Sequence, residues 1–330
     1  MPRLLYTLLA PLLCSLIPPA TGFAAQTVLQ RPMDLDTGTG VLHGTLLLPG
    51  GEGPAPVALL VAGSGPTDRN GNNPMGGRND SLKKLAELLA RNGVASLRFD
   101  KRGIAASRDA GPDERQLSLD GYVDDAVAWA HQLRADPRFS RLILIGHSEG
   151  ALIASLAAPR TEAAALVVIA GSGRPFDQLL VEQLRQRLPP PLLARSAAIL
   201  AALRNGQTVD EVPPPLMVLF RPSVQPYLIS LLAHDPVEAF AAVKVPALIL
   251  QGSHDIQVGV ADAEALKAAK PDAELAVIGG MNHILRITPA GIQEQLGSYN
   301  AAELPLAREL GQHLLAFIAA LPSSPPAGGR

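Results

Sequence analysis

The chain has 330 residues, of which 47% are hydrophobic and 18% are charged, and its formal net charge is −2. This composition excludes a disordered chain, because nearly half of the residues can contribute to a buried core. The small net charge, without a run of lysine and arginine, argues against a nucleic-acid partner. We therefore expect a globular protein with one large α/β domain or two smaller ones.

The N-terminal segment has the pattern of a secretory signal. Arg3 precedes an apolar stretch over residues 4–17, and small residues near Gly22 offer a cleavage site. The apolar stretch is too short to span a bilayer comfortably. We expect residues 1–25 to be removed and the mature protein to be exported to the periplasm or the medium, without stable membrane insertion. Cys14, the single cysteine, lies in this segment, so the mature protein has no disulfide.

Beyond this segment, short apolar strands alternate with helical patterns. Residues 40–49 are expected to form the opening strand of an antiparallel hairpin, and later strands are expected over residues 57–63, 94–100, 141–147, 165–171, 246–252 and 274–280. Helical spacing extends over residues 79–92, 119–135, 149–158 and 259–269. Asp80 or Ser81 is expected to cap the first of these helices and Asp120 the second. The alternation indicates a mostly parallel sheet with helices on both faces.

A long interruption separates the sixth strand, at 165–171, from the strand at 246–252. Proline runs at 189–191 and 213–215 bracket an apolar helical segment within it. A structureless loop of this length is unusual in a compact domain, so we expect helices with proline hinges. The sequence predicts a helical cap or lid over residues 172–240, with an insertion that only adds to the core as the alternative. The core then comprises residues 26–171 and 241–321, followed by a flexible tail at 322–330.

The strongest chemical signal is the motif Gly146-His147-Ser148-Glu149-Gly150, which fits G-x-S-x-G. It follows a predicted strand directly and precedes a predicted helix, as a nucleophile turn requires. The glycines permit a tight turn that lifts the serine hydroxyl off the end of the sheet. The start of the helix offers free N–H groups and its positive dipole end to a developing oxyanion. The pattern predicts Ser148 as a nucleophile.

With this motif in its context, the chain resembles an α/β-hydrolase. Members of that family place the catalytic acid and base after the serine, at the ends of later strands. The resemblance implies that Asp255, in "SHDIQV", is the acid and that His283, in "MNHIL", is the base. It also implies an oxyanion hole formed by the backbone N–H groups of Ser64 and Glu149.

Other acidic and histidine residues are weaker candidates. Asp177 follows the sixth strand, a position that some hydrolases use for the acid. His254 is expected to order the loop of the acid, and His147 to point away from the reacting groups. The remaining rivals lie before the serine or on the terminal helix: His43, His131 and His313.

The loop "GSGPTDRNGNNPMGG" first suggests a cation site. Asp68, Asn70 and Asn72 copy the first three ligand positions of an EF-hand. Asn73 stands where such a loop needs glycine, and Asn79 stands where it needs a bidentate glutamate. We therefore expect no metal and no cofactor. The loop is expected to pack near the pocket mouth and to satisfy its own backbone through side-chain turns.

The turn after the strand at 94–100 extends the resemblance. Asp100 and Arg102, in "FDKRG", are expected to form an internal ion pair that orders the loop, with recognition of a substrate carboxylate as the alternative. The segments "GSGPTDRNGN", "GHSEG" and "RPSVQPYLIS" together resemble exported bacterial serine carboxylesterases with a helical cap. That resemblance implies a small-molecule ester substrate, a short acyl chain and an acyl-enzyme on Ser148.

The fold leaves other activities open. Thioesterases, peptidases, lactonases and cofactor-free haloperoxidases share this arrangement of serine, acid and histidine. The arrangement therefore does not identify the leaving group of the substrate. The apolar segment 192–203 raises the alternative of a lipase that works at a membrane surface. A non-catalytic binding protein with a hydrolase fold is the alternative outside enzymology. The sequence indicates no particular oligomeric state.

Overall fold

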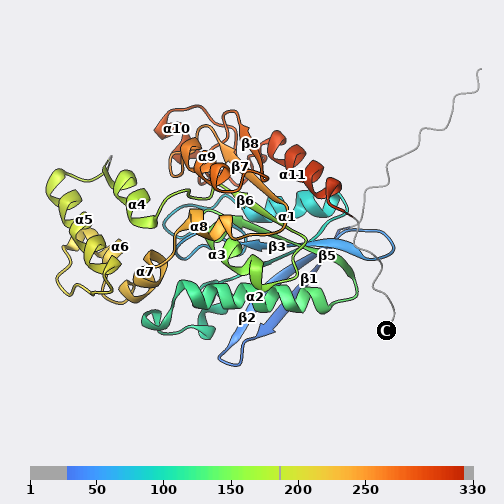
Figure 1. Cartoon of the computed structure of the whole chain (residues 1–330), viewed down its shortest axis with the longest axis horizontal. Coiled ribbons are helices and arrows are strands. Elements are labelled where there is room, and N and C mark those ends of the chain that lie inside the picture. Colours follow the sequence, from blue (N-terminus) through green and yellow to red (C-terminus); the bar gives the residue numbers. More distant parts are fainter. Residues whose placement is uncertain (1–27, 186, 323–330) are drawn as a thin grey trace, which may run out of the picture.

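The computed structural model describes residues 28–185 and 187–322. The expected signal peptide and residues 323–330 of the expected tail lie outside the described residues. An eight-stranded sheet forms the centre of the molecule, in the order β1-β2-β4-β3-β5-β6-β7-β8 (Figure 1). Its strands are β1 (Leu29–Asp36), β2 (Val41–Leu48), β3 (Ala55–Val61), β4 (Ala95–Phe99), β5 (Phe139–His147), β6 (Ala165–Ile169), β7 (Ala247–Gly252) and β8 (Glu274–Ile278).

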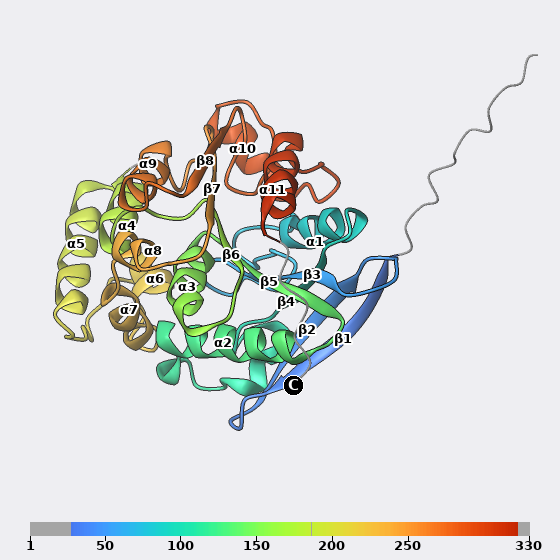
Figure 2. The ribbon, with the colours of Figure 1, turned by 45° about the vertical axis from the view of Figure 1, so that its right-hand side comes forward.

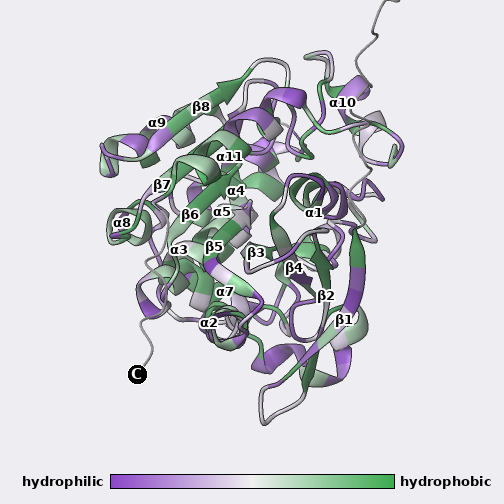
Figure 3. Cartoon of the chain, turned by 90° about the vertical axis from the view of Figure 1, so that its right-hand side faces the viewer, coloured by the Kyte–Doolittle hydropathy of each residue, from purple (hydrophilic) through white to green (hydrophobic). Residues whose placement is uncertain are grey.

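The sheet is mostly parallel, as the sequence predicts. β1 pairs antiparallel with β2 and β2 with β4, while the neighbours from β4 to β8 are parallel. Each residue of β6 is buried, which explains its continuous run of apolar residues. Figure 3 shows the inner strands β3 and β6 in the green of hydrophobic residues. The sequence did not single out β1 as a strand, because Arg31 and Pro32 interrupt its alternation of apolar and polar residues.

Helices cover both faces of the sheet (Figure 2). α1 and α11 pack with the apolar side chains of one face, whereas α2, α3 and α9 pack on the other. The helices and short 3₁₀ turns are α1 (Ser81–Arg91), η1 (Ala105–Ala110), η2 (Glu114–Gln116), α2 (Leu119–Ala135), α3 (Glu149–Ala157), η3 (Ala158–Arg160), α4 (Phe176–Arg185), α5 (Pro190–Arg204), η4 (Pro214–Leu216), α6 (Met217–Phe220), α7 (Gln225–Leu232), α8 (Pro236–Ala241), α9 (Val260–Ala269), α10 (Ile292–Ser298) and α11 (Arg308–Ala320).

The helix starts differ from the expected caps. Asp80 precedes α1, but its backbone is left-handed and its side chain makes no capping hydrogen bond. Ser118 caps α2, because its Oγ accepts a hydrogen bond of 3.0 Å from the N–H of Gly121. Asp120 was the wrong residue for this cap: its carboxylate lies 3.0 Å from the ring of His234. Ser118 has the extended backbone that an N-cap needs, whereas Asp120 already lies inside the helix.

Between β6 and β7 the chain forms α4 to α8, and α4 to α7 project to one side of the sheet (Figure 1). Proline starts three of these elements, since α5 begins at Pro190, η4 at Pro214 and α8 at Pro236. Buried side chains of this segment, Ile199 and Phe220 among them, belong to the apolar cluster that also contains α2 and α3. That residues 172–240 form a separate cap remains a prediction. Within the described residues, no helix is both long and apolar enough to cross a membrane.

Polar contacts fasten one end of this helical segment to the core. Glu114, in η2, accepts hydrogen bonds from Arg221 and from Ser223, the latter at 2.6 Å. Ser230, in α7, accepts a hydrogen bond of 2.8 Å from the N–H of Leu119 at the start of α2. The α7 end of the segment is therefore held against α2 by hydrogen bonds as well as by apolar packing.

Candidate active site

Ser148 occupies a strained turn between β5 and α3. Its φ is 56° and its ψ is −123°, a conformation that residues with a Cβ seldom adopt. The flanking glycines are required by space: a Cβ on Gly146 would lie 2.1 Å from the carbonyl oxygen of Gly150, and a Cβ on Gly150 would lie 2.2 Å from that of Val61. The backbone around the serine is therefore packed too closely for other residues, as in a nucleophile turn.

Asp255 and His283 meet at the carboxyl ends of β7 and β8. Oδ2 of Asp255 lies 2.7 Å from Nδ1 of His283, and both side chains are almost completely buried. Oδ1 of Asp255 accepts hydrogen bonds of 2.7 and 3.0 Å from the N–H groups of Gln257 and Val258. Burial alone would raise the pKa of Asp255, but the charge of His283 and these hydrogen bonds outweigh it and lower the pKa. The carboxylate is thus ionised and aimed at the imidazole.

A compact turn fixes His283. The N–H of Asn282 donates 2.8 Å to the carbonyl of Arg286, and the N–H of Arg286 donates 3.0 Å to Oδ1 of Asn282. The buried guanidinium of Arg286 also donates to the carbonyl of Asn79, at 2.6 Å. His254, which was expected to order the loop of the acid, joins that loop to the one after β8, since its Nδ1 lies 2.7 Å from the carbonyl oxygen of Thr288.

His147 corrects one expectation. It does not point away from the reacting groups, because its Nε2 lies 2.8 Å from the carbonyl oxygen of His283 and the two ring centroids are 4.9 Å apart. Burial, followed by the charge of His283, lowers the pKa of His147 to about 4. The ring is neutral at pH 7, and because a carbonyl only accepts, the proton resides on Nε2. The residue before the serine thus supports the backbone of the expected base.

The serine and the histidine are not hydrogen-bonded to each other in the described part of the chain. Such contacts commonly tighten only when a substrate is bound. The loop after β3 lies against the serine from the other side: a Cβ on Gly63 would be 3.1 Å from Cβ of Ser148 and 3.6 Å from its Oγ. Glycine at this position therefore allows the loop to approach the nucleophile.

The expected oxyanion donors have free N–H groups. Among the described residues, neither the N–H of Ser64 nor that of Glu149 donates a hydrogen bond within the chain. Glu149 is the first residue of α3, so its N–H is one of the unpaired donors at a helix start. Ser64, Ser148 and Glu149 all line one cavity. The two donors are thus available to a ligand beside the serine.

The asparagine-rich loop uses its polar side chains on itself. Oδ1 of Asp68 accepts from the N–H groups of Asn70 and Asn72, at 2.8 and 2.9 Å. Oδ1 of Asn72 accepts from the N–H groups of Asn79 and Asp80, at 3.0 and 2.9 Å. These side chains take the place of regular backbone pairing, which explains why a long loop keeps one shape.

The ion pairs after β4 differ from the expected one. Asp100 pairs with Arg69, whose N–H, Nε and Nη2 all donate to the carboxylate at 2.7 to 3.0 Å. Arg102 pairs instead with Asp125 in α2, at 2.8 Å through Nε. Asp100 and Arg102 thus each form an internal ion pair, but with different partners and not with each other. A substrate carboxylate would have to displace Asp125 from Arg102.

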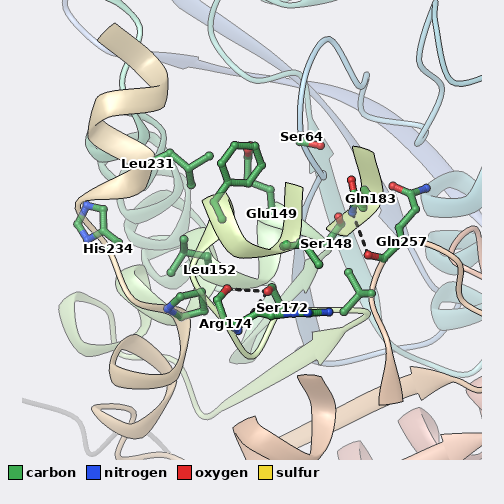
Figure 4. A pocket seen from close by; sticks show the side chains of 14 residues that line it. Ser64, Ser148, Glu149, Leu152, Ser172, Arg174, Gln183, Leu231, His234 and Gln257 are labelled. Atoms are coloured by element: carbon green, nitrogen blue, oxygen red, sulfur yellow. Dashed lines mark hydrogen bonds between the residues drawn. The ribbon is translucent and has the colours of Figure 1, made fainter. Parts of the chain in front are cut away.

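A cavity of about 80 Å³ opens at Ser148 between the core and the segment after β6 (Figure 4). Its apolar lining includes Leu152 from α3, and Leu179 and Leu231 from α4 and α7. Figure 4 shows Ser64, Ser148 and Gln257 toward one side of this cavity and Leu231 and His234 toward the other. The cavity therefore presents the serine to a small, partly apolar space.

The sequence did not point to several residues at the cavity. His234 lines the cavity, and its ring is hydrogen-bonded to Asp120. Arg174 also lines the cavity. Its Nε and Nη2 each donate to Asp262 at 3.0 Å, and its Nη1 donates to Glu182. Gln183 donates 2.9 Å to the carbonyl oxygen of Gln257 (Figure 4). No motif surrounds these residues; only their place in the segment between β6 and β7 could have drawn attention to them.

The weaker candidates lie elsewhere. Asp177 is bonded to Arg204, so it joins α4 to α5 and does not contact His283. His43 lies 2.8 Å from Asp34, and His131 lies 3.2 Å from the carbonyl oxygen of Arg160. His313 is exposed on α11.

Residues 75–287 match the family described as serine aminopeptidase, S33. The chain belongs to this family. The matched region contains Ser148, Asp255 and His283 of this S33 member, but not Ser64. This family match and the solved structures that resemble the S33 chain confirm the predicted α/β-hydrolase fold.

Three of the similar proteins are esterases by description. The S33 chain is 29% identical over 247 residues to the esterase EstD of Thermotoga maritima, a match that covers 74% of this chain and 58% of that relative. The esterase Est1E of Butyrivibrio proteoclasticus superimposes with a TM-score of 0.56 at 18% identity, covering 87% of this chain and 99% of that one. A Pyrococcus furiosus esterase gives a TM-score of 0.55 at 17% identity, covering 89% and 91%.

Proposed function

We propose that this protein is a serine hydrolase that cleaves carboxylic esters with short acyl chains. The observation that carries the proposal is the combination of a strained serine beside a cavity with a buried aspartate–histidine pair whose members hydrogen-bond at 2.7 Å. Strain of this kind concentrates where it serves chemistry. The described esterases with the same fold, and the partial sequence match to EstD, support the choice of substrate class.

The proposed reaction is a two-step acyl transfer. His283, oriented by Asp255, takes the proton of Ser148 as its Oγ attacks the ester carbonyl. The N–H groups of Ser64 and Glu149 stabilise the oxyanion, and His283 then protonates the departing alcohol. Water, with His283 again as base, releases the acid from the acyl-enzyme. The chain's own side chains suffice for this chemistry.

The size of the cavity supports a short acyl chain. A cavity of about 80 Å³ beside the nucleophile, lined by Leu152, Leu179 and Leu231, suits an acyl chain of a few carbons. A lipase reading is less well supported, because Ile199, Leu200 and Leu203 of the apolar segment 192–203 are buried. These side chains are already packed within the protein.

Peptidase activity is the second candidate, because the family description names aminopeptidases. An aminopeptidase needs an anionic group for the free α-ammonium of its substrate. Glu149 is the only acidic residue among the described residues that line the cavity, and its carboxylate lies 3.4 Å from Nζ of Lys101. Since this carboxylate already has a cationic partner, the cavity favours neutral esters.

The test is a rate profile over p-nitrophenyl esters of increasing acyl length, measured beside a thioester and an aminoacyl p-nitroanilide. We expect acetyl and butyryl esters to give the highest kcat/KM and the anilide to give no turnover above that of Ser148→Ala. A higher kcat/KM for the anilide or for long-chain esters would contradict the proposal. A rate jump above the micellar concentration would favour the lipase alternative.

Two further expectations stand as proposals from the sequence. We infer export through residues 1–25, with the mature protein beginning near residue 26. Fractionation of the native host, with N-terminal sequencing of the enzyme, tests this, and an intact N-terminus in the cytoplasm would contradict it. We also infer that residues 172–240 form a cap that selects substrates, which the Leu231 variant described in the Discussion tests.

A further inference from the structure

Lys101 is a buried charge that the proposed reaction does not use. It lies two residues after the end of β4, only 1% of the residue is exposed, and its ammonium lies 4.9 Å from the ring centre of Tyr122. A buried ammonium is costly unless it is paired and hydrogen-bonded. Nζ of Lys101 meets this demand with two partners: the carbonyl oxygen of Gly63 at 2.6 Å and Oε1 of Glu149 at 3.4 Å. Both partners belong to the oxyanion region.

The first partner controls the direction of one oxyanion donor. The carbonyl of Gly63 and the N–H of Ser64 are parts of the same peptide group, which is planar and trans. The two bonds of a trans peptide point in opposite directions, so a fixed carbonyl fixes the N–H. A hydrogen bond from a cation to the carbonyl also polarises the peptide and strengthens its N–H as a donor. Lys101 therefore holds and activates the N–H of Ser64.

The second partner belongs to the residue that supplies the other donor. Glu149 offers its N–H at the start of α3, while its carboxylate, only 7% exposed, pairs with the same ammonium. The chain segments that carry Ser64 and Glu149 are far apart in sequence and come from different strand ends. Lys101 is thus a direct link between them.

We propose that Lys101 is a positioning residue of the oxyanion hole: its ammonium joins the Gly63–Ser64 peptide to Glu149 and sets the two N–H donors for the same oxygen. The proposal rests on the proposed function, because an oxyanion forms only if Ser148 attacks a carbonyl. Lys101 does not contact the substrate. Its effect passes through the backbone of Gly63 and through Glu149.

The main test is Lys101→Met, which keeps most of the side-chain volume and removes the donor. Because one lost oxyanion donor costs about 10²- to 10³-fold in kcat, a misdirected donor should cost about 10- to 100-fold. KM for a p-nitrophenyl ester should change by less than about threefold, in keeping with an effect on the transition state. The affinity for a trifluoromethyl ketone, which forms a tetrahedral adduct with the serine, should fall in parallel with kcat.

A matched control separates positioning from general damage. Lys270 is also buried and paired, with Asp272 at 2.9 Å, but it lies between α9 and β8, at the sheet end away from Ser148. Lys270→Met should lower thermal stability without changing kcat or the ketone affinity. A Lys101→Met protein that is folded, with kcat and ketone affinity equal to those of Lys270→Met, would overturn the proposal.

A second variant keeps the test decisive if Lys101→Met does not fold. Lys101→Met with Glu149→Gln removes both charges, so no unpaired carboxylate remains buried, and it retains both N–H groups. It should show the same loss of kcat and of ketone affinity, and wild-type values for both would overturn the proposal. Failure of the proposed function itself appears separately, as wild-type protein without ester turnover or with turnover that survives Ser148→Ala.

Discussion

The imidazole of His147 donates a hydrogen bond of 2.8 Å to the carbonyl oxygen of His283, so the residue before the nucleophile supports the backbone of the proposed base. The contact joins the end of β5 to the turn after β8, across β6 and β7. It requires a proton on Nε2, which the neutral ring carries at pH 7 because burial lowers the pKa of His147 to about 4. The free energy of unfolding should therefore depend on the protonation of His147 as the pH falls below neutrality.

The first prediction concerns stability at low pH. His147 has a depressed pKa in the folded protein, so the unfolded chain binds its proton first, near pH 6.5, and the folded protein only near pH 4. Its contribution is fully present above pH 6.5 and is lost as the pH falls through this window. The loss amounts to about 3 kcal/mol of unfolding free energy. Urea unfolding at pH 7.5 and pH 4.5 measures it.

The control for this prediction is a pair of variants. His147→Gln should remove most of this part of the pH dependence, whereas His313→Gln, at an exposed position of α11, should keep it. Equal pH profiles for wild type and His147→Gln would show that another group titrates in this range.

The second prediction concerns the nucleophile. Ser148→Ala removes the attacking oxygen and leaves the backbone turn in place, so ester hydrolysis should fall by about 10⁴-fold or more. Circular dichroism should remain that of the wild type. A fluorophosphonate probe should label the wild type and not the variant, and normal turnover by the variant would refute the assignment of Ser148.

The third prediction compares two aspartates. Asp255→Asn should lower kcat by about 10³- to 10⁴-fold, because an amide cannot stabilise the required tautomer and charge of His283. Asp177→Asn should change kcat little, since Asp177 is bonded to Arg204 between α4 and α5. Steady-state kinetics of both variants with an acetyl ester gives the comparison. A severe loss only in Asp177→Asn would move the acid to the end of β6.

The fourth prediction concerns acyl-chain choice. Leu231 of α7 lines the cavity at Ser148, whereas Leu228 of the same helix is buried but does not line it. Leu231→Ala should enlarge the cavity and raise the ratio of kcat/KM for octanoyl over acetyl esters, by about 10-fold. Leu228→Ala should cost comparable stability, about 2 to 5 kcal/mol, and leave the ratio unchanged. Equal ratios in both variants would show that α7 does not select the acyl chain.

The sequence predicted the frame of the fold because its strands and helices carry strong local patterns. The continuous apolar runs of β5, β6 and β7 follow from burial along these strands, and the spacing in α2 follows from burial of one face of that helix. The positions of Ser148, Asp255 and His283 then followed from the G-x-S-x-G motif and from the order of groups in the resembling family. The structure brings Asp255 and His283 into contact.

Side-chain partners were beyond the reach of the sequence. Asp100 and Arg102 lie two residues apart in the chain, yet their partners are Arg69 and Asp125, which only the folded chain brings close. The link from Lys101 to Gly63 likewise depends on a turn of the loop after β3 that no periodicity encodes. Local patterns predict elements, whereas such pairings depend on the angle at which each loop leaves its strand.

The backbone of Ser148 bears on the choice between an enzyme and a binding protein. A residue with a Cβ in a disfavoured conformation costs on the order of 1–3 kcal/mol, and glycine would relieve that cost. A chain selected only for stability would gain by placing glycine at this position, since mutation readily supplies it. Serine at this position therefore lowers the stability of the folded chain relative to glycine, and what it adds to the site is a hydroxyl group.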